Sequence, residues 1–370
     1  MPALDAFLNQ SLAALEKAHL TRKLHEDQYV DAINVLRSGR KYISFASNDY
    51  LGLSHHPQVV AAGVEALERY GTGGGASRLV TGNHPLYAET EVLLATMKGT
   101  EAALIFGCGY LTHIGVIPAL VGKGDLIVLD EFSHASIIDA AKLSGAAMMR
   151  FHHNDMQDAE KQLVTFRGKY ERCLLATETT FSMDGDTAPV GELAALARKY
   201  DAWLLTDDAH GMFQNTKYAA IQMGTLSKAA GNYGGYVCGS RALISYLMSK
   251  ARSFIFSTSL PPATLASIKA ALEVIQSDPD LAKRPLKHAE LFSQLLGLPP
   301  VQSPIVPLII GENEPTLKAA EKLQADGFLV PAIRPPTVPR GTARLRFSFS
   351  AAHQKEDIQR LAECVRKCHA

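Results

Sequence analysis

Residues 203–228 read WLLTDDAHGMFQNTKYAAIQMGTLSK and contain two short apolar runs, at 203–207 and 221–225. Each run has the length and the small or polar flanking residues of a buried strand. Comparable runs lie on both sides of this stretch: ALIF (103–106), DLIVLD (125–130), AAMMRF (146–151), CLLATE (173–178) and GYVCG (235–239). Helical patterns separate several of these runs. The alternation predicts an α/β fold with a mostly parallel central sheet covered by helices.

The pattern changes on either side of this region. From residue 280 onward, a helix, the run IVPLII (305–310), a second helix and the alternating segment RLRFSFS (344–350) predict a smaller α+β domain at 280–370. Residues 1–45 are predicted to form an N-terminal helix and arm, since apolar residues recur there at helical spacing. The large domain is therefore expected at residues 46–279.

Composition narrows the possible locations and partners. The 370 residues include 37 basic and 37 acidic side chains, so the formal net charge is zero, and no nucleic-acid or membrane partner is expected. We expect no signal peptide, because the N-terminus lacks a basic region followed by an apolar run. The five scattered cysteines favour the cytoplasm over a disulfide-bonded exterior, and no metal site is predicted.

Two motifs that follow strands carry the first chemical signal. Lys228 ends TLSK, just past one strand, where an amine can form a Schiff base with a carbonyl cofactor. Asp207 ends the preceding strand, and His210 follows three residues later. A carboxylate there can keep a pyridine nitrogen protonated, so that the ring accepts electrons. The alternatives are a surface lysine in a turn and a carboxylate that caps a helix.

Two further motifs lie after other strands. His134, in DEFSHAS (130–136), could stack on an aromatic cofactor ring or be a structural histidine. FGCGYLTH (106–113) places small residues at the start of a helix, where free N–H groups can bind phosphate. GTGGGAS (71–77) follows no clear strand and has no Walker lysine pattern, so it supports no nucleotide site.

The order of the motifs makes the sequence recognisable. SNDYLGL (47–53), FSMDGD (181–186), DDAHG (207–211), TLSK (225–228), STSLPPA (257–263) and IRPPTVPRGTARLR (333–346) together resemble the α-oxoamine synthases. These are pyridoxal-phosphate (PLP) enzymes of the aspartate-aminotransferase type, fold type I. The resemblance covers residues 20–361 and is greatest to the biotin-pathway members. GNHPLYAETE (82–91) and AIRPPTVP (332–339) favour that branch, whereas PTVPRGT alone suits 5-aminolevulinate synthase.

The resemblance implies roles around the cofactor ring. Lys228 would hold PLP covalently and would also be the base that removes the Cα proton. Asp207 would pair with the pyridine nitrogen, and His134 would stack on the ring. His210 and Ser182 would lie near the phenolic oxygen.

The resemblance also implies a phosphate site that two subunits share. Thr225 and the amides of Gly109 and Tyr110 would hold the phosphate. Thr258, in STSLPPA, would contact it from the neighbouring subunit of a homodimer.

Four residues are expected to bind substrate by the same resemblance. Asn48 and Arg346 would bind the substrate carboxylate, and Thr337 is a further candidate in the IRPPTVP segment. The distance of Arg22 from SNDYLGL matches the place where biotin-pathway members have an arginine near the acyl tail. A guanidinium suits a terminal carboxylate because it donates two hydrogen bonds. The alternative for Arg22 is a solvated cation beside Lys23.

The implied reaction joins an amino acid, L-alanine, to an acyl thioester, pimeloyl-CoA or a pimeloyl carrier protein, with loss of carbon dioxide. The alternatives are 2-amino-3-ketobutyrate CoA ligase, 5-aminolevulinate synthase, serine palmitoyltransferase and a non-catalytic PLP-fold subunit. The last of these usually lacks the lysine, which is present here. One departure concerns the connection between His210 and Lys228, which is longer and glycine-rich in relatives. It leaves loop closure and substrate access open.

Overall fold

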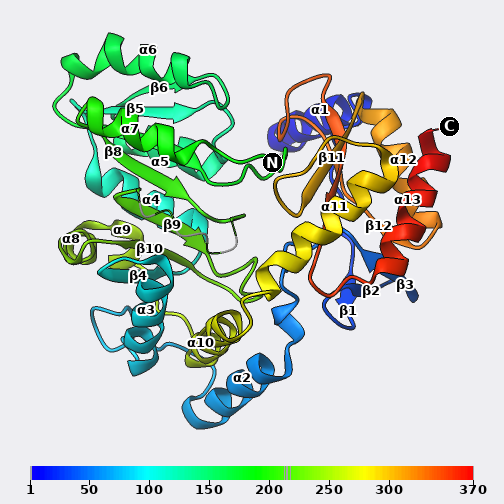
Figure 1. The fold of residues 1–370 in the computed structure, drawn as a ribbon, viewed down its shortest axis with the longest axis horizontal. Coiled ribbons are helices and arrows are strands. Elements are labelled where there is room, and N and C mark those ends of the chain that lie inside the picture. Colours follow the sequence, from blue (N-terminus) through cyan, green and yellow to red (C-terminus); the bar gives the residue numbers. More distant parts are fainter. Residues whose placement is uncertain (1, 212, 214–215, 217, 370) are drawn as a thin grey trace. The chain divides into compact units, whose positions relative to one another are not determined.

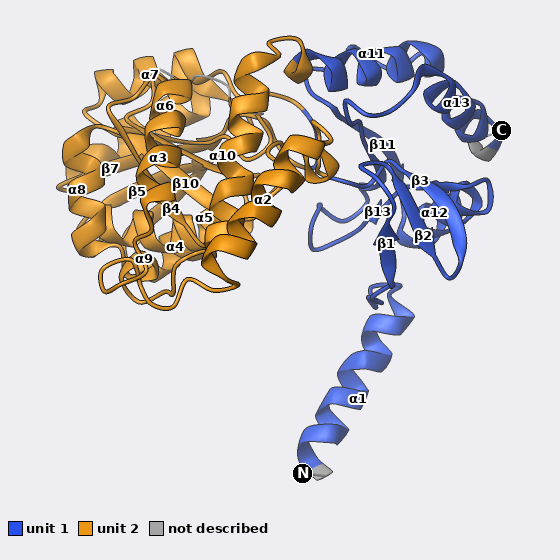
Figure 2. Cartoon of the chain, turned by 90° about the horizontal axis from the view of Figure 1, so that it is seen from below, with its two compact units in different colours: residues 1–47, 183–185, 283–370 blue, residues 48–182, 186–282 orange. Residues whose placement is uncertain are grey.

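The computed structural model describes residues 2–211, 213, 216 and 218–369 (Figure 1). Unit 1 contains residues 1–47, 183–185 and 283–370, and unit 2 contains residues 48–182 and 186–282 (Figure 2). Each unit is described by itself. The N-terminal segment treated above as a separate arm lies within unit 1.

The sheet of unit 2 has seven strands. All four neighbouring pairs among β5 to β9 are parallel, and only β10 runs against its two neighbours. This confirms the mostly parallel sheet, and each of the seven apolar runs is a strand. Their order is β4 (Ala102–Phe106), β10 (Gly235–Gly239), β9 (Ile221–Thr225), β8 (Trp203–Asp207), β7 (Cys173–Glu178), β5 (Leu126–Asp130) and β6 (Ala147–Phe151).

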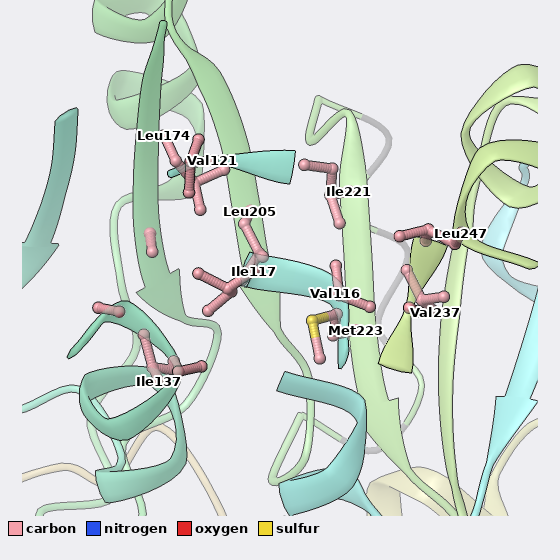
Figure 3. Packing of buried hydrophobic residues seen from close by; sticks show 14 of the residues in the cluster. Val116, Ile117, Val121, Ile137, Leu174, Leu205, Ile221, Met223, Val237 and Leu247 are labelled. Atoms are coloured by element: carbon pink, nitrogen blue, oxygen red, sulfur yellow. The ribbon is translucent and has the colours of Figure 1, made fainter. Parts of the chain in front are cut away.

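Strand β5 shows why consecutive residues in the middle of such a run are apolar. Ile127 and Leu129 belong to one hydrophobic core, and Leu126 and Val128 belong to another. Because successive side chains point to opposite faces, each face of the sheet is covered. Helices α4 (Gly109–Leu120) and α5 (Ala135–Ser144) contribute to the first core, shown in Figure 3. Helices α6 (Met156–Phe166) and α7 (Val190–Lys199) contribute to the second.

The other helices of unit 2 lie outside these two pairs. Helix α10 packs on α2 and α3. Helices α8 and α9 add Ile244, Leu247 and Phe254 to the first core. The bounds are α2 (Pro57–Tyr70), α3 (Pro85–Lys98), α8 (Arg241–Lys250), α9 (Arg252–Ile255), α10 (Pro262–Ser277) and the 3₁₀ segments η1 (Leu53–His55) and η2 (Arg167–Lys169).

Unit 1 contains two small sheets. One has the order β1 (Asp27–Tyr29), β2 (Asn34–Arg37), β3 (Arg40–Ser44) and β12 (Phe328–Leu329). The other has the order β11 (Ile305–Gly311), β14 (Ala343–Ser348) and β13 (Ala332–Ile333). The pairing of β3 with β12 joins the N-terminal arm to the C-terminal part of the chain. The helices are α1 (Pro2–Lys17), α11 (Arg284–Leu296), α12 (Asn313–Ala325) and α13 (Lys355–His369), with the 3₁₀ segment η3 (Leu281–Lys283) at the entry to α11.

Strand β14 departs from what its alternating sequence suggests. Its polar positions are buried as fully as its apolar ones, and they include Arg344 and Arg346. Arg344 forms an ion pair of 2.5 Å with Asp184. Asp184 belongs to unit 1 although residues 183–185 lie in the middle of the sequence. A buried guanidinium needs such a partner. None of the described helices is long and apolar enough to cross a membrane.

Candidate active site

Polar side chains gather at one edge of the large sheet. Asp130, Glu178, Asp207 and Thr225 are the last residues of β5, β7, β8 and β9, and all four are buried. Because these strands are parallel, their carboxyl ends meet at the same edge, which is where such sheets bind ligands.

Lys228 takes part in a chain of hydrogen bonds at this edge. Its Nζ lies 2.8 Å from His210 Nε2, and His210 Nδ1 lies 2.7 Å from the hydroxyl of Tyr50. That hydroxyl donates to Asn48 Oδ1 at 3.2 Å. A phenol has one proton, so Tyr50 accepts from His210 Nδ1–H, and Nε2 is left to accept from the lysine. Lys228, His210 and Asn48, each predicted as a site residue, are therefore connected in unit 2.

Asp207 and His134 are connected through two other side chains. His113 Nε2 lies 3.4 Å from Asp207 Oδ2, and His113 Nδ1 lies 2.9 Å from Ser136 Oγ. The same hydroxyl lies 2.6 Å from His134 Nδ1. Burial lowers the pKa of both histidines, against the opposing effect of the Asp207 carboxylate. His134 therefore presents an uncharged aromatic ring at neutral pH.

Glu178 is a second buried carboxyl group at this edge. It lies opposite Asp207 in the register of β7 and β8. Burial first, and then the negative charge of Asp207, raise the pKa of Glu178 well above its usual range. The surroundings of Glu178 therefore favour its protonated form. The charge of Asp207 thus disfavours ionisation of the carboxyl group beside it.

The start of α4 lies beside Thr225. Cys108 precedes the helix in an extended conformation and gives no side-chain cap, so the first N–H groups have no partner within the helix. A Cβ atom placed on Gly109 would lie 3.4 Å from Thr225 Cβ, so Thr225 packs against the helix start. A Cβ atom on Gly235 would lie 2.6 Å from the nitrogen of Gly109. Glycine at 235 therefore allows β10 to pass close to this end.

Three other predicted residues of unit 2 lie as follows. Ser182 is half-buried and directly follows Phe181 after β7. Thr258 is exposed in the single chain. The phenol of Tyr110 is exposed and donates to Asp139 Oδ2 at 2.8 Å, and its backbone amide belongs to the first turn of α4. The roles of these residues remain predictions.

The remaining predicted residues belong to unit 1. Arg22 Nη2 lies 3.5 Å from Thr337 Oγ1, so two residues far apart in the sequence are neighbours, and Arg22 is exposed. Arg346 is buried and donates to Ser348 Oγ at 2.6 Å. Their roles toward substrate also remain predictions.

Four residues of the site were missed by the sequence analysis. Tyr50 and His113 lie within motifs quoted there, SNDYLGL and FGCGYLTH, and Ser136 ends DEFSHAS. The spacing of His113, four residues after Gly109, places it one helical turn inside α4 and was the available signal. Glu178 gave a weaker signal, because a carboxylate that ends a strand is commonly solvated. Among the described residues no cluster of His, Cys, Asp and Glu could hold a metal.

Comparisons with known proteins agree with this geometry. Residues 40–365 match the model of the aminotransferase class I and II family. The 8-amino-7-oxononanoate synthase of Beijerinckia indica is 50% identical over an alignment of 377 residues, gaps included. The alignment covers 99% of this chain and 98% of that protein. The synthase of Methylobacterium nodulans is 52% identical, with 98% and 97% covered.

Solved structures show the same fold. Sphingomonas wittichii serine palmitoyltransferase superimposes with a TM-score of 0.92 at 29% identity, covering 99% of this chain and 97% of that one. The 8-amino-7-oxononanoate synthase of Francisella tularensis gives 0.75 at 26% identity, covering 88% and 97%. A serine palmitoyltransferase with PLP gives 0.90 at 28% identity, covering 100% and 98%. The chain therefore belongs to the aminotransferase class I and II family and, within it, to the family of the 8-amino-7-oxononanoate synthases.

Proposed function

We propose that this chain catalyses the PLP-dependent condensation of L-alanine with a pimeloyl thioester, giving 8-amino-7-oxononanoate, carbon dioxide and a free thiol. The observation that carries the proposal is the placement of Lys228 against His210, beside the strand end that bears Asp207, in a chain about half identical to synthases of that name. The acyl carrier would be coenzyme A or a carrier protein.

The residues at the sheet edge fit PLP. The open start of α4, at Gly109 and Tyr110, and the hydroxyl of Thr225 suit a phosphate. Asp207 suits a protonated pyridine nitrogen, and the uncharged ring of His134 suits stacking. When bound, PLP withdraws electrons from the Cα atom of an attached amino acid.

Lys228 would serve as both the cofactor's attachment point and the base. Once an amino acid displaces it, its amine is free to take the Cα proton. His210 Nε2 accepts from the lysine at 2.8 Å and so holds the amine in place. His210 in turn donates to Tyr50, which fixes the orientation of its ring. Ser182 would lie near the phenolic oxygen, and Asn48 and Arg346 would bind the substrate carboxylate.

The proposal is tested by the products. Protein supplied with L-alanine labelled at its carboxyl carbon and with pimeloyl-CoA should release thiol and labelled carbon dioxide in equal amounts. The amino ketone should carry no label. Parallel reactions with glycine and acetyl-CoA, glycine and succinyl-CoA, and L-serine and palmitoyl-CoA test the other α-oxoamine syntheses. Faster thiol release in one of those reactions would replace the proposed substrates.

Arg22 provides a test of the acyl donor. We propose that Arg22, with Thr337 beside it, binds the terminal carboxylate of the pimeloyl chain. Hydrogen bonds to charged groups contribute roughly 1.5–3 kcal/mol, and about 1.4 kcal/mol corresponds to tenfold. Arg22→Ala should therefore lower kcat/KM for pimeloyl-CoA by about tenfold or more and leave heptanoyl-CoA, which ends in a methyl group, almost unchanged. Lys23→Ala is the matched control. Equal losses with both donors would assign Arg22 to structure or to coenzyme A.

We also propose that the chain acts in the cytoplasm as a homodimer. Cys108, Cys173 and Cys238 are free thiols, as expected in a reducing compartment. The exposure of Thr258 leaves it accessible to a second subunit, whose phosphate site it would complete. Sedimentation of the purified protein should give twice the chain mass, and a monomer with full activity would contradict the shared site.

A further inference from the structure

Another histidine of unit 2, His153, lies between two carboxylates, and no role has been assigned to it so far. His153 follows β6, and its Nδ1 lies 3.0 Å from Oδ1 of Asp130, the last residue of β5. Its Nε2 lies 2.7 Å from Asp186 Oδ2. Each ring nitrogen faces a carboxylate oxygen, which can only accept. The ring therefore donates from both nitrogens and is an imidazolium.

The surroundings of the ring favour this charge. Phe132 stacks on it with ring centroids 4.6 Å apart, and Phe181 meets it edge-on at 4.3 Å. Although burial acts in the opposite direction, the hydrogen bonds to Asp130 and Asp186 raise the pKa of His153 to about 10. The cation is thus present throughout the range in which the protein would work.

The two carboxylates belong to the two segments that carry His134 and Ser182. Asp130 Oδ1 accepts from the amide of Phe132 at 2.8 Å, and the Asp130 carbonyl accepts from the amide of Ser133 at 3.0 Å. Together these bonds shape the turn that leads to His134.

Asp186 closes the other segment. Its carbonyl accepts from the amide of Phe181 at 2.9 Å, and Ser182 is the next residue. Asn154 strengthens the connection, since its amide donates to Asp130 Oδ2 and its side chain donates to Asp186 Oδ2, both at 2.9 Å. Residues 153 and 154 therefore join the two segments from the end of β6.

We propose that His153 is a positioning residue, whose imidazolium ties the segment bearing His134 to the segment bearing Ser182 and so holds both against PLP. The inference rests on the proposed function, because it concerns the same cofactor. A neutral side chain at 153 would leave Asp130 and Asp186 without the cation between them. Both segments would then lose their common anchor, although neither His134 nor Ser182 is itself changed.

The test measures the affinity of apoprotein for PLP, which needs no turnover. His153→Gln and Asp186→Asn should each raise the Kd for PLP by about tenfold or more. The double variant should be no weaker than the weaker single variant, because both changes remove the same bridge. His153→Arg, which keeps a cation able to donate to both carboxylates, should recover part of the affinity. The matched control is His152→Gln, an exposed neighbour paired with Asp158, and it should bind PLP as the wild type does.

Melting of each apoprotein separates positioning from folding. If His153→Gln and Asp186→Asn lower Tm but leave the Kd for PLP unchanged, the cluster is structural and the inference is wrong. Asp186→Asn keeps the shape of the side chain and one of its acceptor oxygens. The test can therefore be made with this variant alone if His153→Gln does not fold. Wild-type protein that binds no PLP would refute the proposed function, and the inference with it. Wild-type binding without loss in the variants would refute the inference alone.

Discussion

Lys228→Ala should lower the rate of product formation by roughly 10³-fold or more, because it removes the covalent attachment and the base together, and a positioned base alone contributes about 10²–10⁴-fold. The folded protein should survive the change. Lys228 is half-buried and is not a member of the hydrophobic cores. Its hydrogen bond is to His210, another residue of the site. The variant should still bind PLP, but loosely. Initial rates of thiol release and a PLP titration measure the two effects.

The matched control for this variant is Lys142→Ala. Lys142 lies on α5, its side chain is 64% exposed, and its partner Asp139 is 3.8 Å away, so its loss should leave the rate unchanged. If Lys228→Ala keeps more than about a tenth of the wild-type rate while Lys142→Ala behaves normally, Lys228 is neither the attachment point nor the base.

Lys98→Met should give a large loss of stability, roughly 3–5 kcal/mol, because it leaves a buried carboxylate without its cation. Lys98 Nζ lies 2.8 Å from Asp208 Oδ2, and both side chains are fully buried. Asp208 also accepts from Thr179 Oγ1 at 2.9 Å. Burial raises the pKa of Asp208 even against the opposing effect of Lys98, which shows how costly the lone carboxylate would be. Denaturant unfolding of the apoprotein measures the loss.

A second variant distinguishes the ion pair from simple packing. Asp208→Asn should also lower the free energy of unfolding. The loss in the double variant should be smaller than the sum of the two single losses by about 2 kcal/mol, because neither buried charge is then left without its partner. Lys199→Met, which breaks an exposed pair of 2.6 Å with Glu160, should change little. Strict additivity of Lys98→Met and Asp208→Asn would show that the two charges do not stabilise each other.

Local patterns predicted the large sheet because most of its strands are buried on both faces. A run such as LIVL (126–129) has to be apolar at every position, and this makes it visible in the sequence. The parallel order then places Asp207 and the segment ending at Lys228 at one edge without further information. This part of the site was predictable from the sequence.

Pairings between distant segments were not predictable in this way. Arg344 lies in an alternating strand, where period two suggests a solvated face, but its partner Asp184 is 160 residues away. His153 likewise contacts Asp130 and Asp186, which are 23 and 33 residues away in the sequence. The residues next to His153 in the sequence do not indicate these two partners. Periodicity reports which face a residue occupies, but it does not report which residue faces it.

The short connection between His210 and Lys228 lies partly outside the described residues, which omit 212, 214, 215 and 217. Its described part is bonded to the sheet. Thr216 Oγ1 lies 3.1 Å from Thr206 Oγ1 and donates to Gln222 at 3.0 Å. These bonds tie the connection to β8 and β9. How substrate passes this segment was left open by the sequence analysis, and it stays open here.

Reduction with borohydride, followed by peptide mapping, tests the assignment of the cofactor most directly. The purified holoprotein should be yellow and should lose that colour on reduction. Mass analysis should then find one phosphopyridoxyl group per chain, on the peptide that contains Lys228. The reduced protein should be inactive. A modified peptide containing another lysine, such as Lys98 or Lys142, or reduced protein with no phosphopyridoxyl group on any peptide, would contradict the assignment of the site.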